Sequence, residues 1–251
     1  MKIYPSHPRA QSLKIRERLV WGVKRGITSL AGLTAHGRGE AFDYLLGEKT
    51  QLFAKKATQT AAAYLLTAKH PVLSVNGNSA VLCAKEYIQI ARLLRCNIEV
   101  NLFHFTKRRV ENVENYLKKL DSKRVLISDR KQKITIPNIT SPRKVMLREG
   151  IGRADVVFVP LEDGDRCEVL IAKGKKVITV DLNPLSRTAQ KATVTIVDNI
   201  TRVMPLLYEE LRSLQQAKQA KLKRIIDHYD NAKTLGKALQ HINIKLSSLV
   251  K

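Results

Sequence analysis

Four short apolar runs in this chain end abruptly in small or polar residues. The runs are VLSV, DVVFVPL, KVITV and TVTIV, and they lead into residues 76–78 (NGN), 162–166 (EDGDR), 181–183 (DLN) and 198–199 (DN). Apolar runs without alternation are typical of strands that are buried on both faces of a parallel sheet. In open sheets of that kind, ligands bind beyond the carboxyl ends of the strands. We therefore expect the four polar segments to line one site.

Segments with helical spacing of apolar residues separate these runs. One extends from Val81 to Leu94 and another from Val110 to Leu120, and the runs IEVNLF and VLIS that follow them read as further strands. This alternation is that of repeated strand-helix-strand units. It predicts an α/β fold with a Rossmann-like, doubly wound, mostly parallel sheet of about six strands and helices on both faces.

The two ends of the chain are expected to be helical. Residues 1–70 and 201–251 show helical patterns, with a break near Asp230-Asn231, and residues 71–200 hold the sheet. No linker rich in Pro, Gly or Ser divides the chain, and its 251 residues are enough for one sizeable core. We expect a single domain over residues 1–251 with helical extensions at both ends.

The charge of the chain is strongly positive. It carries 45 Lys and Arg against 22 Asp and Glu, a formal net charge of +23, which attracts nucleic acids and small anions alike. Basic residues dominate residues 107–153 and 218–251, which read as solvated faces and loops. Aromatic residues make up only 5% of the chain and are not interleaved with basic ones, as a base-stacking surface requires. No specific nucleic-acid partner is expected.

Nothing in the sequence indicates a membrane or secreted protein. No apolar run has transmembrane length, and the first residues do not form a signal peptide. Cys83, Cys96 and Cys167 show no metal-binding or redox spacing, so we expect them to be buried thiols. These features predict a cytoplasmic protein.

The common phosphate-binding motifs are missing, but one glycine-rich segment is notable. His36 precedes Gly37-Arg38-Gly39, where two glycines could let a ligand approach the backbone and the guanidinium could grip a phosphate or carboxylate. A plain connector between helices is the alternative. His36 is a candidate proton acceptor or a hydrogen-bonded structural group.

Each polar segment after a strand can likewise be interpreted either as a ligand contact or as a structural turn or cap. Ser186 is a candidate helix cap beside Arg187, and the turn is suited to an anion. Asp181 and Asn183 could bind ribose hydroxyls or a base edge, or could simply form a capped turn. The carboxylates of residues 162–165 suit Mg²⁺, or a helix dipole.

Several of these segments resemble the archaeal-type phosphopantothenate synthetase family, and the resemblance runs through nearly the whole chain. The matching segments are residues 6–9 (SHPR), 35–44 (AHGRGEAFDY), 74–78 (SVNGN), 159–166 (VPLEDGDR), 181–187 (DLNPLSR), 196–199 (IVDN), 229–231 (YDN) and 233–235 (KTL). The chain departs from the family between residues 107 and 153 and in its lysine-rich tail.

The resemblance implies an activity. Members of the family join 4-phosphopantoate to β-alanine at the expense of ATP, with Mg²⁺, and form 4′-phosphopantothenate, AMP and diphosphate through a phosphopantoyl adenylate. This reaction belongs to coenzyme A biosynthesis, and the family also implies a homodimer. Two other classes stay open from the residues alone, a non-enzymatic nucleic-acid-binding protein and another ATP-using Rossmann-like enzyme with a different substrate.

The resemblance also assigns residues to roles. Arg38 and His36 are the candidate catalytic residues, and Asn76 and Asn78 are candidates for orienting 4-phosphopantoate. The implied ATP contacts are Arg16, Arg38, Asp181, Leu182, Asn183, Arg187, Thr188, Asn199 and Ile200. Arg16 and Arg38 are expected to hold phosphates, and the residues after the strands to hold ribose and adenine.

Overall fold

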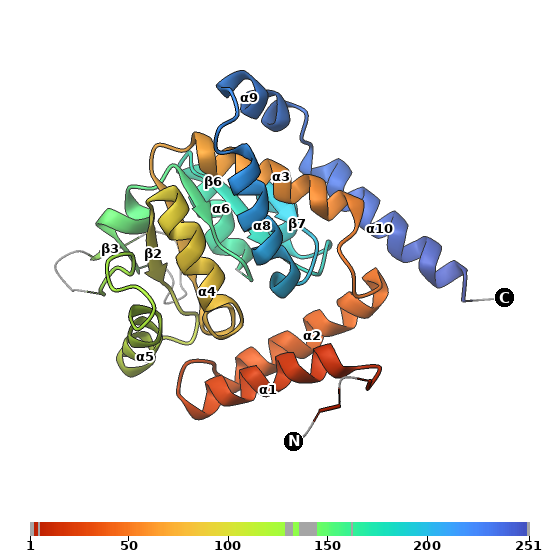
Figure 1. Cartoon of the computed structure of the whole chain (residues 1–251), viewed down its shortest axis with the longest axis horizontal. Coiled ribbons are helices and arrows are strands. Elements are labelled where there is room, and N and C mark those ends of the chain that lie inside the picture. Colours follow the sequence, from red (N-terminus) through yellow and green to blue (C-terminus); the bar gives the residue numbers. More distant parts are fainter. Residues whose placement is uncertain (1–2, 5, 129–132, 136–144, 162, 250–251) are drawn as a thin grey trace.

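A five-stranded, all-parallel sheet forms the centre of the molecule (Figure 1). The computed structural model describes residues 3–4, 6–128, 133–135, 145–161 and 163–249. The strands are β1 (Pro71–Val75), β2 (Asn97–Val100), β5 (Val156–Phe158), β6 (Lys176–Val180) and β7 (Val194–Ile196). Their spatial order is β2-β1-β5-β6-β7, one of the common orders of doubly wound sheets. The predicted parallel α/β fold is confirmed, and the strand order reverses between β1 and β5.

The predicted sixth strand, over residues 125–128, is reduced to one isolated bridge. Val125 pairs in parallel with Ile98 on the edge strand β2. The backbone amide of Ser128 then donates to the carboxylate of Glu114, which draws the chain away from the sheet. A separate antiparallel pair, β3 (Lys133–Thr135) and β4 (Val145–Leu147), leads into the π-helical turn η3 (Arg148–Gly152).

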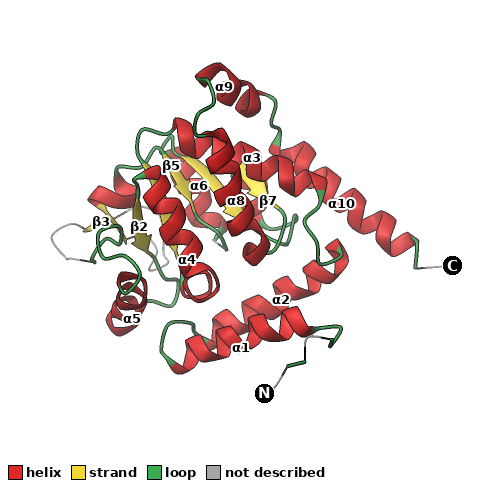
Figure 2. Ribbon diagram, viewed as in Figure 1, coloured by secondary structure: helices red, strands yellow, loops and turns green. Residues whose placement is uncertain are grey.

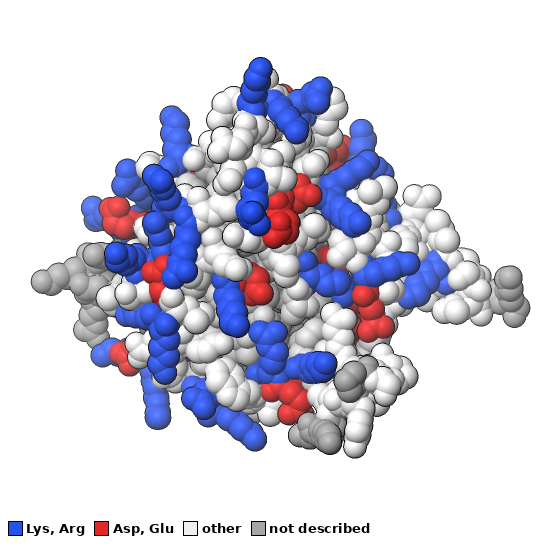
Figure 3. Space-filling model, viewed as in Figure 1, with Lys and Arg blue, Asp and Glu red and all other residues white. Residues whose placement is uncertain are grey.

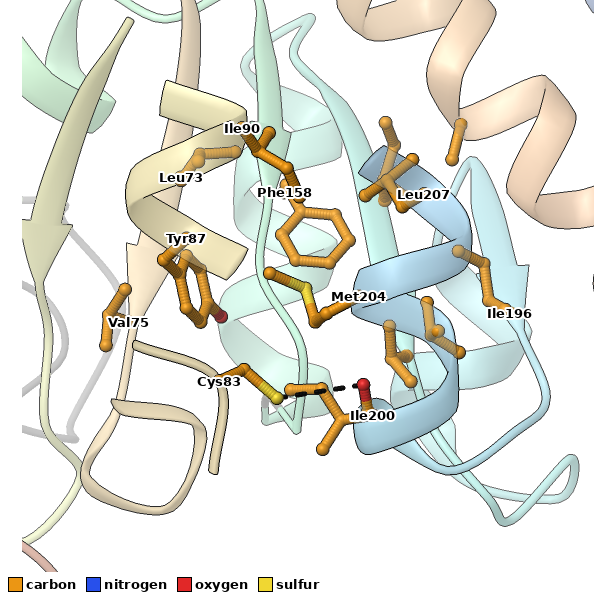
Figure 4. Close-up of a cluster of buried hydrophobic side chains, with 14 of the residues drawn as sticks. Leu73, Val75, Cys83, Tyr87, Ile90, Phe158, Ile196, Ile200, Met204 and Leu207 are labelled. Atoms are coloured by element: carbon orange, nitrogen blue, oxygen red, sulfur yellow. Dashed lines mark hydrogen bonds between the residues drawn. The ribbon is translucent and has the colours of Figure 1, made fainter. Parts of the chain in front are cut away.

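Helices cover both faces of the sheet (Figure 2). Alternate residues of each strand face opposite cores, so that Phe158 enters the larger core and Val157 the smaller one. Figure 4 shows the larger core, where Tyr87 and Phe158 meet edge to face beside Met204. The larger core is lined by α3 (Leu52–Thr67), α4 (Gly77–Leu94), α5 (Lys107–Lys118) and α8 (Ile200–Leu214), and the smaller core by α6 (Gly164–Ala172). The short helix α7 (Arg187–Lys191) contributes Ala189 to the larger core.

The helical hairpin of α1 (Ala10–Lys24) and α2 (Leu30–Leu46) packs against α4 near the carboxyl ends of the strands. The interpretation of residues 35–44 as a glycine-rich turn or connector is wrong, because they lie inside α2. Ser29 caps this helix by accepting from the amide of Gly32. Its glycines cost helix propensity, which tertiary packing offsets. At Gly32 a Cβ atom would lie 2.6 Å from Asn78 Oδ1, so glycine permits the close contact between α2 and α4.

The helix α4 has a kink, and the residues just before it are hydrogen-bonded to α1. Cys83 has a non-helical backbone, with φ of −140°. The carbonyl oxygens of Val81 and Leu82 accept hydrogen bonds from the guanidinium of Arg18 at 2.9 and 2.6 Å. The thiol of Cys83 donates to the carbonyl oxygen of Ile200 at the start of α8 (Figure 4). All three cysteines are buried, as expected.

The C-terminal part of the chain is helical, as predicted. It contains α9 (Gln219–Asp227) and α10 (Asn231–Ser247), and the predicted break near Asp230 is confirmed because the Asp230 side chain caps α10. Asn231 Oδ1 accepts from the amide of Thr195 on the edge strand β7 at 2.8 Å, which covers this edge of the sheet. Within the described residues, no helix combines the length and apolar character needed to cross a membrane.

Candidate active site

A cavity of about 600 Å³ lies between α2 and the carboxyl ends of the strands. It spans the point where the strand order reverses, which is where open α/β sheets bind ligands. Its walls come from α2, from the segments that follow β1, β2, β5, β6 and β7, and from α5. The polar and charged residues among its lining are Ser29, His36, Arg38, Asn76, Asn78, His104, Arg109, Asp163, Asp181, Asn183, Ser186, Thr188, Asp198 and Asn199.

The segments predicted to form one site do converge on this cavity. Of the candidate site residues, all but Arg16 and Arg187 line it. The segments that follow β1, β6 and β7 contribute Asn76, Asn78, Asp181, Leu182, Asn183, Thr188, Asn199 and Ile200, and α2 contributes His36 and Arg38. The sequence pattern therefore located the cavity, because the carboxyl ends of parallel strands meet at one edge of a sheet.

Arg38 projects from α2 and lines the cavity without a protein partner. Its side chain makes no hydrogen bond or ion pair with any residue that the structure describes, and it is exposed. The backbone at Gly37 and Gly39 is helical, so its amides bond within the helix rather than to a ligand. The glycines do leave space, since a Cβ at Gly37 would meet nothing and one at Gly39 would lie 3.5 Å from Leu182.

His36 borders the cavity from the same helix. Its Nε2 atom is buried and has no hydrogen-bond partner among the described residues. Burial lowers the pKa of His36, and the carboxylate of Glu40 offsets only part of this effect. The imidazole is therefore neutral at neutral pH and able to accept a proton.

Arg16 lies outside the cavity and is bound to a carboxylate. Its Nε and one terminal nitrogen donate to the two oxygens of Glu40 at 2.9 and 2.8 Å. Although burial opposes it, hydrogen bonds from Arg16 and Tyr44 lower the pKa of Glu40 to about 2. Arg16 and Tyr44 line a separate hollow of about 290 Å³, which shares His36 with the large cavity.

Arg187 also points away from the cavity. Its guanidinium pairs with Asp165 at 2.7 Å and with Glu168 at 3.4 Å, both on α6. Of the acidic segment at residues 162–165, Asp163 lines the cavity, while Glu162 lies outside the described residues. Within the described parts of the chain, no three His, Cys, Asp or Glu side chains are grouped so that they could hold a metal ion.

Asn76 and Asn78 use their side chains to hold the walls together. Asn76 caps α4 by accepting from the Ser79 amide at 3.0 Å, and it donates to the carbonyl oxygen of Pro160 at 3.0 Å. Asn78 donates to the carbonyl oxygen of Gly32 at 2.8 Å. These bonds join α4 to α2 and to the segment after β5.

The turn after β6 is held by Asp181. Its carboxylate accepts from the amide of Asn183 at 2.9 Å and from the hydroxyl of Ser186 at 2.5 Å. Burial raises the pKa of Asp181. Ser186 also caps α7 by accepting from the Ala189 amide, so the predicted cap is confirmed.

A buried ion network anchors α2 above the end of β7. The guanidinium of Arg202 on α8 binds both Asp43 on α2 and Asp198, which follows β7. Asn199 donates to Asp43 at 2.9 Å, and Thr50 donates to Asp198 at 2.6 Å. The side chains of Asp43 and Asp198 are only 8% and 2% exposed. Arg202 thus fixes the helix that carries His36 and Arg38.

Sequence reasoning missed two arginines, one that lines the cavity and one that anchors α2 beside it. Arg109 lies in the basic stretch that read as solvated surface, and no local motif distinguishes it from its neighbours. Arg202 lies one helical turn after Asp198 on an amphipathic helix. The spacing of Asp198 and Arg202 was the only available signal.

The fold and the cavity define an α/β protein with a cavity at the switch point of a parallel sheet, lined by cationic and polar groups. A model of the phosphopantothenate/pantothenate synthetase family matches residues 53–245. The chain belongs to this family.

Curated relatives match almost the entire chain. A protein of Thermococcus onnurineus is 49% identical over 249 residues, which cover 99% of this chain and 95% of the relative. One from Thermococcus kodakarensis is 47% identical over the same shares, and one from Methanosarcina mazei is 44% identical over 97% and 95% of the two chains. All three are named 4-phosphopantoate–β-alanine ligase.

Replacing Arg202 should destabilise the protein strongly. Arg202→Met leaves two buried carboxylates without their cation, so we expect the free energy of unfolding to fall by roughly 3–5 kcal/mol. Arg212→Met on the same helix, which removes an exposed pair with Glu209, should cost under about 1 kcal/mol. Urea denaturation followed by circular dichroism measures both. Equal stability of the two variants would contradict the anchoring role of Arg202.

Proposed function

We propose that this protein catalyses the ATP-dependent ligation of 4-phosphopantoate with β-alanine, a step of coenzyme A biosynthesis. The products are 4′-phosphopantothenate, AMP and diphosphate. The observation that carries this function is the 44–49% identity to ligases of that name over nearly the full length of both chains. The cavity supports it, because about 600 Å³ is within the usual range for small-molecule sites and the cations that line it, Arg38 and Arg109, suit anionic substrates.

The first chemical step joins two anions. A carboxylate oxygen of 4-phosphopantoate attacks the α-phosphorus of ATP, a P–O bond forms, and the bond to the departing diphosphate breaks. Repulsion between the negative groups is the main barrier that the protein has to lower. Arg38 is the proposed residue for this role, because its guanidinium faces the cavity and is not neutralised by a described carboxylate.

The second step forms the amide bond. The amine of β-alanine attacks the acyl carbon of the adenylate, and AMP leaves with the electrons of the C–O bond. The ammonium form of β-alanine has to lose a proton before it can attack. His36 is the proposed acceptor, since burial keeps its imidazole neutral and its Nε2 has no partner within the described residues.

The groups that follow the strands are the proposed nucleotide contacts. Asp181, Leu182, Asn183, Thr188, Asn199 and Ile200 line one end of the cavity, near β6 and β7, where they would hold ribose and adenine. Arg16 and Arg187 remain proposed ATP contacts by resemblance. Each would have to exchange a carboxylate partner, Glu40 or Asp165, for a phosphate.

Mg²⁺ is proposed to enter with the phosphates of ATP. Two of the three described cavity carboxylates are already engaged, because Asp198 is bound to Arg202 and Asp181 holds its own turn. Within the described residues, the third, Asp163, does not complete a group of three possible metal ligands. Mg²⁺ commonly takes substrate phosphates and waters as most of its ligands. We therefore assign no step of the reaction to a protein-held metal ion.

We expect no specific nucleic-acid partner. On the face shown in Figure 3, Lys and Arg are spread widely with acidic side chains between them, rather than gathered in one stripe. A field of this kind attracts small anions and weakens with salt. The homodimer that the family resemblance implies stays a prediction.

The proposed function is tested by product analysis. Incubation with ATP, Mg²⁺, 4-phosphopantoate and β-alanine should yield AMP and diphosphate, and omission of either organic substrate should abolish turnover. Chromatography of the nucleotides and a diphosphate assay measure the result. Formation of ADP and orthophosphate would show that the adenylate route is wrong.

Arg38→Ala should slow adenylation. The lost charge-assisted contact is worth roughly 1.5–3 kcal/mol, so the rate of adenylate formation should fall by about tenfold or more. Arg38→Lys should recover only part of the rate, because an ammonium lacks the planar fork of the guanidinium. Rapid-quench assays measure the rate, and melting curves should stay unchanged. A wild-type rate of adenylate formation in Arg38→Ala would exclude Arg38 as a catalytic residue.

His36→Asn should impair the second step but spare the first. We expect turnover to fall by about 100-fold, whereas diphosphate release without β-alanine stays within a few-fold of wild type. In the wild-type protein, kcat/KM for β-alanine should decrease as the pH falls, because protonated His36 cannot accept a proton. This decrease should lie below the ordinary imidazole pKa of about 6.5, because burial lowers the pKa of His36. The variant should lack this decrease, and its persistence would exclude His36 as the proton acceptor.

A further inference from the structure

Arg109 brings an uncompensated positive charge to the end of the cavity near β2. It lies in the first turn of α5, and its guanidinium donates to the carbonyl oxygens of His104 and, at 3.0 Å, Ile27. Its Nε atom is buried and has no partner among the described residues. Burial lowers the pKa of Arg109, and no described carboxylate forms an ion pair with it. A half-buried cation of this kind gains most from an anionic ligand.

The surroundings of Arg109 add to the positive potential. One terminal nitrogen would lie 3.2 Å from a Cβ atom built on Gly77, the first residue of α4. Glycine is required at this position, because the same Cβ would lie 2.3 Å from the carbonyl oxygen of Ile27. The guanidinium is therefore packed beside the first turn of α4, before the kink at Cys83, and the backbone amides of this turn carry partial positive charge.

Apolar side chains and His104 line the cavity near Arg109, and two carboxylates with protein partners lie at its far end. Leu82, Leu102 and Phe103 line the cavity on the side of α4 and the segment after β2. Asp181 and Asp198 line it at the ends of β6 and β7. The Arg109 end therefore suits a phosphate attached to a short, branched hydrocarbon.

We propose that Arg109 binds the phosphate monoester of the acid substrate and makes the site selective for the phosphorylated acid. This inference rests on the proposed function and names a residue that selects its substrate. With the phosphate held at the β2 end, the rest of the acid can extend along the apolar wall toward the switch point. Its carboxylate can then face a nucleotide bound at the ends of β6 and β7.

The inference is tested by comparing two acids on the same enzyme preparation. In Arg109→Met, kcat/KM for 4-phosphopantoate should fall by about 10- to 100-fold, while the smaller value for unphosphorylated pantoate changes by under about threefold. The ratio of the two values does not depend on the fraction of folded enzyme, because both acids meet the same protein. Arg109→Lys, which keeps the charge, should give an intermediate ratio, and the KM for ATP should stay within about threefold.

Arg108→Met is the matched control, because Arg108 is the exposed neighbour on α5 and does not line the cavity. Its selectivity ratio should equal that of the wild type. Calorimetric titration with 4-phosphopantoate should show the same loss of affinity in Arg109→Met alone. Equal losses for both acids, or unchanged 4-phosphopantoate affinity, would overturn the role of Arg109. A wild-type protein that forms no AMP with either acid would instead overturn the proposed function.

Discussion

The position of α2 depends on one buried ionic contact, the guanidinium of Arg202 between Asp43 and Asp198. This contact joins a helix from the N-terminal hairpin to the last strand of the sheet and to the start of α8. Without the guanidinium, the buried carboxylates of Asp43 and Asp198 would face each other without a compensating positive charge, which is strongly unfavourable. The cavity exists because this pairing holds α2 across the ends of the strands, with His36 and Arg38 on its inner side.

Close backbone contacts complete the other side of the cavity. Gly32 lets α2 approach Asn78, and Gly77 lets the start of α4 approach the carbonyl oxygen of Ile27. Asn76 and Asn78 add hydrogen bonds that join α4 to the segment after β5 and to α2. Both side chains line the cavity, and the hydrogen bonds of Asn76 and of the Asn78 amide nitrogen go to protein groups, which fixes the distances between the walls. That Asn76 and Asn78 orient 4-phosphopantoate stays a prediction.

Local patterns predicted the sheet and its ligand-binding edge, because buried parallel strands leave a clear signature of apolar runs that end in polar residues. They failed at α2, since Gly37 and Gly39 resemble a turn and only packing against the rest of the protein makes the segment helical. They also could not separate Arg38 from Arg16 and Arg187. Whether an arginine faces a ligand or an acidic side chain is decided by partners such as Glu40 and Asp165, which are distant in sequence.

The same criterion selects two of the proposed functional cations within an unusually basic chain. A net charge of +23 attracts anions from all sides, but exposed charges are screened within about 8 Å at physiological salt. What distinguishes Arg38 and Arg109 is that each lines the cavity and neither is neutralised by a described carboxylate. Arg202 carries the same charge but forms ion pairs with Asp43 and Asp198. Arg16 forms an ion pair with Glu40. The roles proposed for Arg38 and Arg109 therefore rest on their lack of an acidic partner among the described residues, whereas those of Arg16 and Arg187 rest on the family resemblance.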